Sequence, residues 1–431
     1  MATGTPLDPW DPPADRLENL LLELLAFDTA NPPGRTREMA EWTDSFLTNL
    51  GLETEWIVED PAKPNLFAHL PGDCDENLLY LGHFDTVPYA SAEWTHDPLG
   101  ERVNDRIFGR GATDMKGPLA AMLEMLRGFV ETGTSPPLSL TLGIVSDEEV
   151  AGEAGLPAVL DSRSLDAVGC VIGETTCEGG RHSISVADRG AIWVTVGATG
   201  VSAHGSRPML GENAIDRLYD AIETIRDRVA GRSIDVPPPV ESTVEESVAY
   251  YTPVMGEEAA RSLFERPSIN LGTMQGGESI NSVPRSAQAE LDIRLAPGVE
   301  TAAVLADLRS CVDACAGVEI IDVSWSVGTY EDPEEPLVEA VATVAEHVTD
   351  ARIYRRSSTG GGDAKRLREV GLPTVEFALG TDTVHATDEY TTTAALQANR
   401  DIYASVPFVL ANSLSVQHMS NSRDTGNNSV V

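Results

Sequence analysis

Five side chains that can bind metal ions stand on separate short motifs of this chain, nearly all of them where an apolar segment ends. They are His83, Asp114, Glu149, Glu174 and His385. Two imidazoles and three carboxylates suit a pair of divalent ions that share one carboxylate. Asp85 follows the first histidine by two residues, and Glu148 directly precedes Glu149. The motifs therefore also supply one carboxylate to orient a ligand and another to transfer a proton.

Apolar extended segments alternate with amphipathic helices along the first part of the chain, which predicts an α/β fold with a largely parallel sheet. Leucines recur at helical spacing in residues 15–27. The predicted strands that precede three of the metal-seeking side chains cover residues 77–82, 138–145 and 167–172. Because sites in α/β sheets form at the carboxyl ends of the strands, we expect His83, Glu149 and Glu174 to lie at one edge of the sheet.

His83 and Asp85 are two residues apart at the end of an apolar strand. In an extended segment such residues point the same way, so the Asp85 carboxylate is expected to accept the imidazole N–H and fix the tautomer of His83. Asp114 lies between glycines at a strand-to-helix junction, where its carboxylate could reach two ions or could simply cap the following helix.

From about residue 190 the pattern changes to β-α-β-β-α-β, the order of the ferredoxin-like unit. The first pattern resumes after residue 330, and His385 lies in this last portion. We therefore expect a discontinuous catalytic domain, residues 1–189 and 331–431, with residues 190–330 inserted into it. Within the insertion, the acidic stretch Ile234–Glu258 shows no clear periodicity and is interpreted as an exposed loop.

The charge balance is strongly acidic: 68 acidic and 30 basic residues give a formal net charge of -38, and only Lys63, Lys116 and Lys365 are lysines. With 42% hydrophobic residues the chain should fold, so we interpret the charge as adaptation to very high salt, where the Debye length is about 3 Å. Such a surface repels nucleic acid and anionic lipid. The sequence has neither a long apolar run nor an N-terminal secretory signal, and we expect a cytoplasmic protein without a membrane partner.

The ordered motifs GHFDTVP, GRGATDMKG, SDEE, GET and VHATDE resemble those of the zinc aminoacylase and carboxypeptidase family, which includes acetylornithine deacetylases and succinyl-diaminopimelate desuccinylases. The resemblance spans nearly the whole chain. It implies a zinc-exopeptidase-like α/β catalytic domain with an inserted ferredoxin-like dimerisation or lid domain, and two divalent ions per subunit, zinc or cobalt.

The resemblance also assigns roles to the metal-seeking residues. It implies that His83 and Glu174 bind one ion, that Glu149 and His385 bind the other, and that Asp114 bridges them. Asp85 would orient His83, and Glu148 would be the general base. In this family the peptide bond after the bridging aspartate is often cis, so a cis bond is expected between Asp114 and Met115.

The inserted domain would contribute to the site through the segment GVSAHGSRPMLGENAID, in which the resemblance implies that His204 reaches the active site of a partner subunit and stabilises the oxyanion. A homodimer is therefore expected. The segment SINSVPRSAQAELDIRLAPG implies that Asn281 and Arg294 lie near the substrate, although a structural ion pair is an equal explanation for Arg294. In GGGDAKRL, Gly361 and its neighbours would let backbone amides approach a substrate carboxylate. Three successive glycines depart from the pattern expected of desuccinylases.

These observations predict hydrolysis of an amide bond in an N-acyl amino acid. An exopeptidase that cleaves dipeptides or C-terminal residues would use the same metal centre and is the alternative within the enzymes, since pocket shape alone separates the two. An inactive relative that binds amino acids is an alternative of another class. The sequence argues against it, because neither a ligand nor the base is missing.

Overall fold

The computed structural model describes residues 12–13, 15–177, 180–231 and 236–425, and the chain within it forms two compact units. The first unit comprises Met1–Val186, Glu331–Arg355 and Gly362–Val431, and the second comprises Ala187–Tyr330 and Arg356–Gly361. The N-terminal residues 1–11, on which the expectation of a leaderless chain depends, lie outside the described residues. Among the described residues, no helix is long and apolar enough to cross a membrane.

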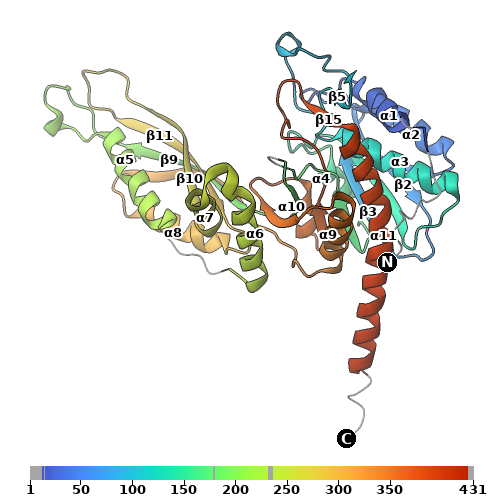
Figure 1. The fold of residues 1–431 in the computed structure, drawn as a ribbon. Coiled ribbons are helices and arrows are strands. Elements are labelled where there is room, and N and C mark those ends of the chain that lie inside the picture. Colours follow the sequence, from blue (N-terminus) through green and yellow to red (C-terminus); the bar gives the residue numbers. More distant parts are fainter. Residues whose placement is uncertain (1–11, 14, 178–179, 232–235, 426–431) are drawn as a thin grey trace, which may run out of the picture. The chain divides into compact units, whose positions relative to one another are not determined.

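An eight-stranded sheet forms the centre of the first unit (Figure 1). Its strands lie in the order β1 (Glu53–Asp60), β2 (Lys63–Leu70), β6 (Ser139–Val145), β3 (Asn77–His83), β7 (Gly169–Ile172), β14 (Thr374–Glu376), β8 (His182–Asp188) and β13 (Ile353–Ser358). The four central strands, from β6 to β14, are parallel. The expectation of a largely parallel sheet is correct only for this centre, because β2 joins β1 and β6 in antiparallel fashion and β8 is antiparallel to β14. A two-residue link between β1 and β2 permits only the antiparallel arrangement.

Helices cover both faces of this sheet. They are α1 (Arg16–Leu25), α2 (Arg37–Asn49), α3 (Lys116–Thr132), α9 (Pro336–Thr349) and α11 (Thr393–Thr425), together with the short α4 (Leu156–Ser162) and α10 (Asp363–Glu369). Helix α1 follows the expected leucine pattern, since all of its leucines except Leu22 are buried. Helix α11 packs against α3 and α9 (Figure 1). Apolar side chains of α4 and α10 pack on the other face, against Leu79 and Leu81.

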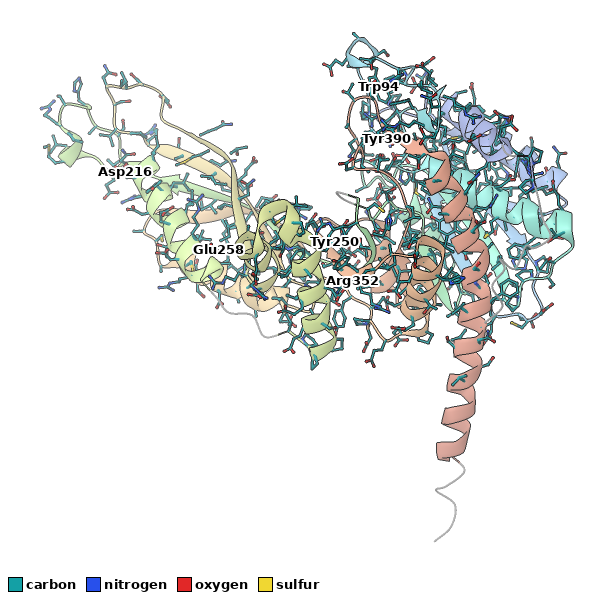
Figure 2. The ribbon with its side chains drawn as sticks, in the orientation of Figure 1. Trp94, Asp216, Tyr250, Glu258, Arg352 and Tyr390 are labelled. Atoms are coloured by element: carbon teal, nitrogen blue, oxygen red, sulfur yellow. The ribbon has the colours of Figure 1, made fainter. Side chains whose placement is uncertain are left out.

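A small three-stranded sheet lies beside the large one in the first unit. It has the order β15 (Tyr390–Thr392), β5 (Arg106–Phe108) and β4 (Glu101–Val103), and Figure 2 shows Tyr390 and Trp94 in this region. All of its pairs are antiparallel. The small sheet therefore connects the segment after His83 with the segment after His385, although more than 250 residues separate β5 from β15 along the chain.

The second unit has the predicted ferredoxin-like order. It comprises β9 (Gly190–Thr199), α5 (Ala214–Ile225), β10 (Ser268–Gly276), β11 (Ser286–Leu295), α8 (Thr301–Asp313) and β12 (Val318–Ser326), with the strands in the order β10-β11-β9-β12. Side chains from α5 and α8 form one core with the inward-facing residues of the sheet, such as Val194 and Leu291. Asn213 caps α5 by accepting hydrogen bonds from the N–H groups of Ile215 and Asp216.

The interpretation of Ile234–Glu258 as an exposed loop is wrong. Helices α6 (Pro238–Met255) and α7 (Glu257–Glu265) occupy this region, and α6 buries Val240, Val244 and Val248. These valines recur every four residues, a helical spacing that the surrounding acidic residues obscure. The helix is held within its own unit by Tyr250 (Figure 2), whose ring lies 4.9 Å from the guanidinium of Arg356.

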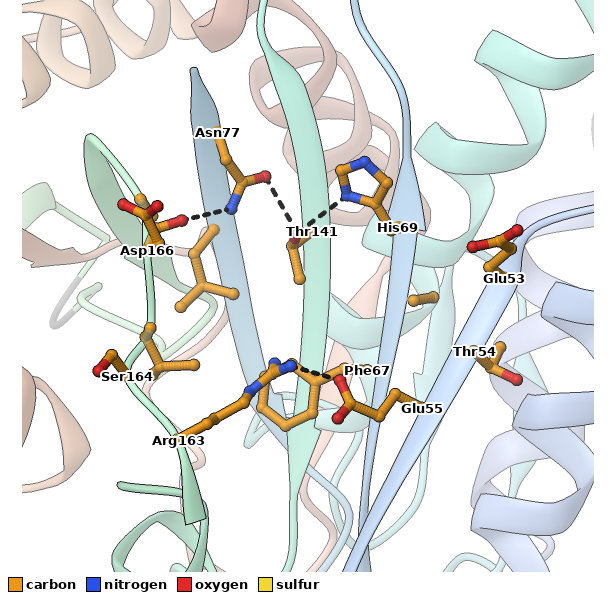
Figure 3. Close-up of a pocket in the computed structure, with 14 residues that line it drawn as sticks. Glu53, Thr54, Glu55, Phe67, His69, Asn77, Thr141, Arg163, Ser164 and Asp166 are labelled. Atoms are coloured by element: carbon orange, nitrogen blue, oxygen red, sulfur yellow. Dashed lines mark hydrogen bonds and ion pairs between the residues drawn. The ribbon is translucent and has the colours of Figure 1, made fainter. Parts of the chain in front are cut away.

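A groove of about 420 Å³ opens on the first unit at the amino ends of β3 and β6 (Figure 3). Asn77 donates a hydrogen bond of 3.2 Å to the carbonyl oxygen of Asp166 across it, and Arg163 pairs with Glu55. Asn77 and His83 are the two ends of β3, so the groove lies at the opposite end of this strand from the metal-seeking residues. None of the five predicted ligands lines it.

Candidate metal centre

The five predicted ligands come together at the carboxyl end of the parallel strands. His83 is the last residue of β3, Glu149 follows β6, and Glu174 follows β7. Asp114 lies in the loop before α3, and His385 lies between β14 and β15. Strand ends that are far apart in the sequence meet here because parallel strands finish at the same edge of the sheet.

The ligand atoms form two groups that share one residue. The first is His83, Asp114 and Glu174, and the second is Asp114, Glu149 and His385. His83 Nε2 lies 3.3 Å from Asp114 Oδ1 and 3.1 Å from Glu174 Oε1. His385 Nε2 lies 3.1 Å from Asp114 Oδ2 and 3.3 Å from Glu149 Oε2. Each carboxylate oxygen of Asp114 thus faces a different histidine.

These distances fit divalent ions. Two ligand atoms that each lie about 2.0–2.1 Å from one tetrahedral zinc ion are about 3.3 Å apart, close to the four separations above. In addition, the buried atoms His83 Nε2 and Asp114 Oδ1 have no hydrogen-bond partner among the described residues. Buried polar atoms are rarely left so, and a cation would satisfy both. The donor set and its spacing therefore fit two metal ions that share Asp114.

The ring of His83 is oriented differently from the expectation. Its Nδ1 atom lies 2.9 Å from the main-chain carbonyl oxygen of Asp85, whereas the nearest oxygen of the Asp85 carboxylate is 3.7 Å away. The strand ends at His83, so the alternation of side chains no longer applies at Asp85. The carbonyl group still selects the tautomer in which Nε2 is free to bind a metal ion.

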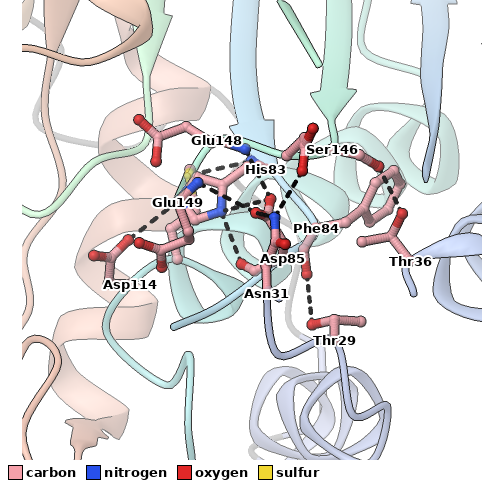
Figure 4. A network of polar contacts seen from close by, with 12 residues as sticks. Thr29, Asn31, Thr36, His83, Phe84, Asp85, Asp114, Ser146, Glu148 and Glu149 are labelled. Carbon is pink, nitrogen blue, oxygen red and sulfur yellow. Dashed lines mark hydrogen bonds and ion pairs between the residues drawn. The ribbon is translucent and has the colours of Figure 1, made fainter. Parts of the chain in front are cut away.

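The Asp85 carboxylate instead holds the turn that follows β6 (Figure 4). Its Oδ1 accepts a hydrogen bond of 3.2 Å from the N–H of Glu148, and its Oδ2 accepts one of 3.2 Å from the N–H of Glu149. The side-chain amide of Asn31 donates to the same Oδ2 at 2.8 Å. Asp85 therefore connects the loop after His83 to both the predicted base and the predicted ligand.

A second buried carboxylate, Glu389, holds the loop that carries Asp114, and its role was not predicted. Its Oε1 accepts the N–H groups of Thr113 at 2.8 Å and Asp114 at 3.0 Å. Its Oε2 pairs with Arg110 at 2.6 Å, and Arg110 also donates to the carbonyl oxygen of His385. The Arg110–Glu389 pair therefore connects the loop that carries Asp114 to the loop that carries His385. The available sequence signal was an acid four residues after His385.

The cis peptide bond expected between Asp114 and Met115 is present. Glu148, the predicted base, lies beside the turn at Gly362, where an added Cβ atom would stand 3.1 Å from Glu148 Oε1. A methyl group added at Gly362 would therefore contact this carboxylate tightly, and the carboxylate would have to shift by a few tenths of an ångström. The sequence pattern pointed to Gly361, whereas the glycine that lies against Glu148 is its neighbour Gly362.

Replacing Gly362 by Ala is expected to lower kcat about 10- to 100-fold, because displacing a catalytic group by a fraction of an ångström to one ångström has effects of this size. Steady-state kinetics on any substrate that the wild type hydrolyses would measure it. Gly272→Ala, in the second unit, is the control, since an added Cβ there meets no atom closer than 3.6 Å. Equal effects of the two substitutions would contradict the contact with Glu148.

Burial and the mutual repulsion of the carboxylates change the protonation of the metal-free site. Burial, with the charge of Asp114, raises the pKa of Glu174 to about 8. The carboxylates of Asp114 and Glu149 raise the pKa of His385 to about 10. Burial also raises the pKa of Glu148 well above its ordinary value. Burial lowers the pKa of His83, but the adjacent carboxylates outweigh it and hold this pKa well above its ordinary value. Protons on the two histidines and on Glu174 therefore compete with a cation at pH 7.

The affinity for divalent metal is accordingly expected to rise as the pH increases from about 6 to about 8. The pKa values of His385, about 10, and Glu174, about 8, lie at or above this range, so each residue releases a proton when it binds metal. Affinity should increase about tenfold per pH unit for each proton released. Calorimetric titration of Zn²⁺ into metal-free protein, in buffers of different ionisation enthalpy, measures the affinity and the number of protons released. Affinity independent of pH would show that these residues are not ligands.

The other predicted site residues belong to the second unit. His204 is exposed, and its Nδ1 lies 2.8 Å from Ser206 Oγ. Asn281 is exposed on the neighbouring loop and accepts a 2.6 Å hydrogen bond from Gly205. Arg294 donates to Asp292 at 2.8 Å, which is the ion pair left open by the sequence. Gly361 is the last residue of this unit.

Two groups of side chains that could hold metal ions at the carboxyl end of an α/β sheet, with a half-buried glutamate beside them, are typical of metal-dependent hydrolases. The sequence model of peptidase family M20/M25/M40 matches residues 79–407. The chain therefore belongs to this family, and it is a metal-dependent hydrolase that acts on amide bonds. Its fold is the α/β catalytic domain of the family with a second, ferredoxin-like domain.

Relatives of this chain match it over most of its length. The chain is 30% identical over 350 residues to the succinyl-diaminopimelate desuccinylase of Rhodospirillum centenum, covering 79% of this chain and 83% of that one. It is 29% identical over 370 residues to the enzyme of the same name from Acidiphilium cryptum, covering 84% and 90%. Among solved structures, an M20 family metallo-carboxypeptidase from Sulfolobus solfataricus superposes with a TM-score of 0.73 at 20% identity, covering 91% of this chain and 100% of that one. Human carnosine dipeptidase 1 superposes with a TM-score of 0.69 at 18% identity, covering 93% and 96%.

Proposed function

We propose that the protein removes the acyl group from an N-acyl amino acid with the help of two divalent metal ions. The observation that carries the proposal is Asp114, whose two oxygens face different histidines at 3.3 and 3.1 Å. Succinyl-diaminopimelate and acetylornithine are the leading substrates, and the relatives named succinyl-diaminopimelate desuccinylase support the first. Cleavage of dipeptides or C-terminal residues is the alternative that the same centre could serve.

In this proposal the five ligands divide between the ions as the two observed groups suggest. His83 and Glu174 bind one ion, Glu149 and His385 bind the other, and Asp114 bridges them. Zinc is the expected metal, with cobalt as a substitute. When bound, the two ions supply Lewis acidity that polarises the amide carbonyl and lowers the pKa of a water molecule.

Glu148 carries the proton in the proposed reaction. Its carboxylate accepts a proton from the attacking water as the water oxygen bonds to the acyl carbon. The carbon–nitrogen bond then breaks, and Glu148 returns the proton to the leaving nitrogen, so that an amine and a carboxylic acid are released. Asp85 keeps Glu148 in place through its main-chain N–H, and Gly362 leaves space for the carboxylate.

We further propose a homodimer in which His204 of the partner subunit donates a hydrogen bond to the oxyanion. Asn281, Arg294 and Gly361 would contact the substrate. The loops around His204 support an interface, because they expose several large apolar side chains in one part of the second unit. These are Val201, Met209, Leu210 and Ile280.

Mixing two inactive variants is expected to restore activity if His204 acts across the dimer. His204→Ala keeps the metal centre and base, whereas Glu148→Gln keeps the donor histidine, so a mixed dimer contains one complete site. The two variants are purified separately and mixed. Their subunits are exchanged by diluting and then concentrating the mixture, and its activity is measured. Activity that stays at the sum of the two separate values, with mixed dimers demonstrated by mass spectrometry, would place His204 outside the partner's site.

The substrate is tested with a panel of acylated amino acids and peptides. Metal-free protein is loaded with Zn²⁺ or Co²⁺ and incubated with succinyl-diaminopimelate, acetylornithine, other N-acyl amino acids and dipeptides, and released amine is measured. Deacylation without dipeptide cleavage supports the proposal, and dipeptide cleavage alone supports the exopeptidase. No turnover of any compound by protein that holds two ions would contradict both.

The same assay tests the proposed source environment. We propose a cytoplasmic enzyme of a cell with very high internal salt, supported by the net charge of -38. Activity is compared in about 0.2 M and about 3 M KCl, because only the higher concentration screens repulsion at distances of a few ångströms. Higher activity and a higher unfolding temperature in dilute buffer would contradict adaptation to salt.

A further inference from the structure

The turn after β6 brings together an unusual backbone and a buried carboxylate. Asp147, which directly precedes Glu148, has a φ angle of +65°, in the left-handed region that residues other than glycine seldom adopt. Asp147 is only 6% exposed, and its side chain is held from two sides. Lys63, one of the three lysines of the chain, pairs with Asp147 Oδ1, and Asn31 donates to the same oxygen at 2.9 Å.

The side-chain nitrogen of Asn31 that donates to Asp147 also makes a second hydrogen bond. This Nδ2 atom donates to Asp85 Oδ2 at 2.8 Å (Figure 4). A side-chain amide carries two N–H donors on one nitrogen, so a single Asn31 can join two carboxylates that would otherwise repel each other. Asn31 is 2% exposed, and its main-chain N–H donates to the carbonyl oxygen of Thr86 at 2.8 Å, which fixes it beside the loop that carries Asp85.

The two carboxylates joined by Asn31 hold the residues of the turn in different ways. Asp85 accepts the main-chain N–H groups of Glu148 and Glu149. Asp147 precedes both, and its carbonyl oxygen accepts the N–H of Gly152 at 2.8 Å, which closes the turn. A shift of either carboxylate would therefore move the base Glu148 and the ligand Glu149 together.

We infer that Asn31 is a positioning residue that sets the base Glu148 and the metal ligand Glu149 relative to each other through Asp85 and Asp147, with Lys63 as its support. The inference rests on the proposed roles of Glu148 and Glu149. It has a distinctive consequence, because the turn carries a ligand to only one of the two ions. Loss of Asn31 should weaken the ion bound by Glu149 and His385 and leave the ion bound by His83 and Glu174 nearly unchanged.

The test is a metal titration combined with kinetics on Asn31→Ala. We expect the affinity for one of the two Zn²⁺ ions to fall about 10- to 100-fold, the usual effect of removing an outer partner of a ligand, while the other stays within about twofold. At saturating Zn²⁺, kcat should fall by a similar factor with little change in KM, because the base moves and the substrate contacts do not. Asn77→Ala is the control, since Asn77 lies at the other end of β3 (Figure 3) and its amide contacts only the groove.

Lys63 provides a second test if Asn31→Ala does not fold. Lys63→Met removes the other donor to Asp147 and should weaken binding of the same ion and lower kcat. Lys63→Arg keeps the charge, so its metal affinity and kcat should stay near the wild-type values. If folded Asn31→Ala or Lys63→Met binds both ions and turns over substrate like the wild type, the inference is wrong. Equal weakening of both ions, with a lower unfolding temperature, would also overturn it in favour of a merely structural role. The wild-type substrate panel tests the proposed function separately.

Discussion

Replacing Glu148 by Gln is expected to lower kcat by about 10²- to 10⁴-fold, the contribution typical of a general acid–base group. Glutamine has nearly the same size but cannot accept the proton of water or return it to the leaving nitrogen. Glu148 is not among the residues of either metal-binding group, so the variant should still bind two ions. Steady-state kinetics and elemental analysis of the same preparation measure the two quantities.

The control for Glu148→Gln is Glu18→Gln. Glu18 is a buried carboxylate of the same unit whose partners, Arg102 at 2.9 Å and Thr393 at 2.5 Å, belong to neither metal-binding group. Its replacement should affect stability and leave kcat near the wild-type value. If Glu148→Gln retained wild-type turnover, the base would have to be another residue; if it lost its metal, Glu148 would have to be a ligand.

Replacing Asp114 by Asn is expected to have the largest effect on the metal centre. One oxygen of Asp114 faces each histidine, and an amide offers only one oxygen and no negative charge. Loss of a residue that only holds a ligand in place lowers metal affinity about 10- to 100-fold. The affinities for both ions should fall by more than this, and turnover should be lost with them. Titration of Zn²⁺ monitored by competition with a chromophoric chelator measures the affinities.

Glu174→Gln is the matched comparison for Asp114→Asn. Glu174 belongs to only one of the two groups, so its replacement should weaken one ion and spare the other. If Asp114→Asn likewise weakened a single ion, the shared carboxylate would not bridge the pair, and the assignment of ligands would need to be redrawn.

The sequence predicts that the metal-seeking side chains lie close together, because parallel strands end at a common edge, and the structure brings them into two groups. An acid or histidine directly after an apolar strand is visible in the sequence, and His83, Glu149 and Glu174 are of this kind. The ferredoxin-like order of the second unit was visible for a similar reason, since its strands and helices keep a clear periodicity. Helices α6 and α7 were missed there, and in α6 the buried valines are separated by acidic side chains.

The residues that hold the ligands could not be predicted in the same way. Asn31 and Glu389 lie in loops without periodicity, and most of their partners are main-chain N–H groups or residues more than 50 positions away. The role of the Asp85 carboxylate was also missed, since alternation along a strand says nothing about the residue beyond its last position. Such contacts depend on how loops meet in space, which local sequence does not encode.

The measurement that tests the account most directly is the metal content of the wild-type protein at saturation. Metal-free protein is dialysed against Zn²⁺ at pH 8, where the protons on Glu174 and His385 are more easily displaced than at lower pH, and the bound zinc is determined by mass spectrometry against the protein concentration. We expect two ions per chain, because the ligand atoms form two groups that share Asp114. A plateau at one ion, or at none, would contradict the two-metal centre on which the proposed hydrolysis depends.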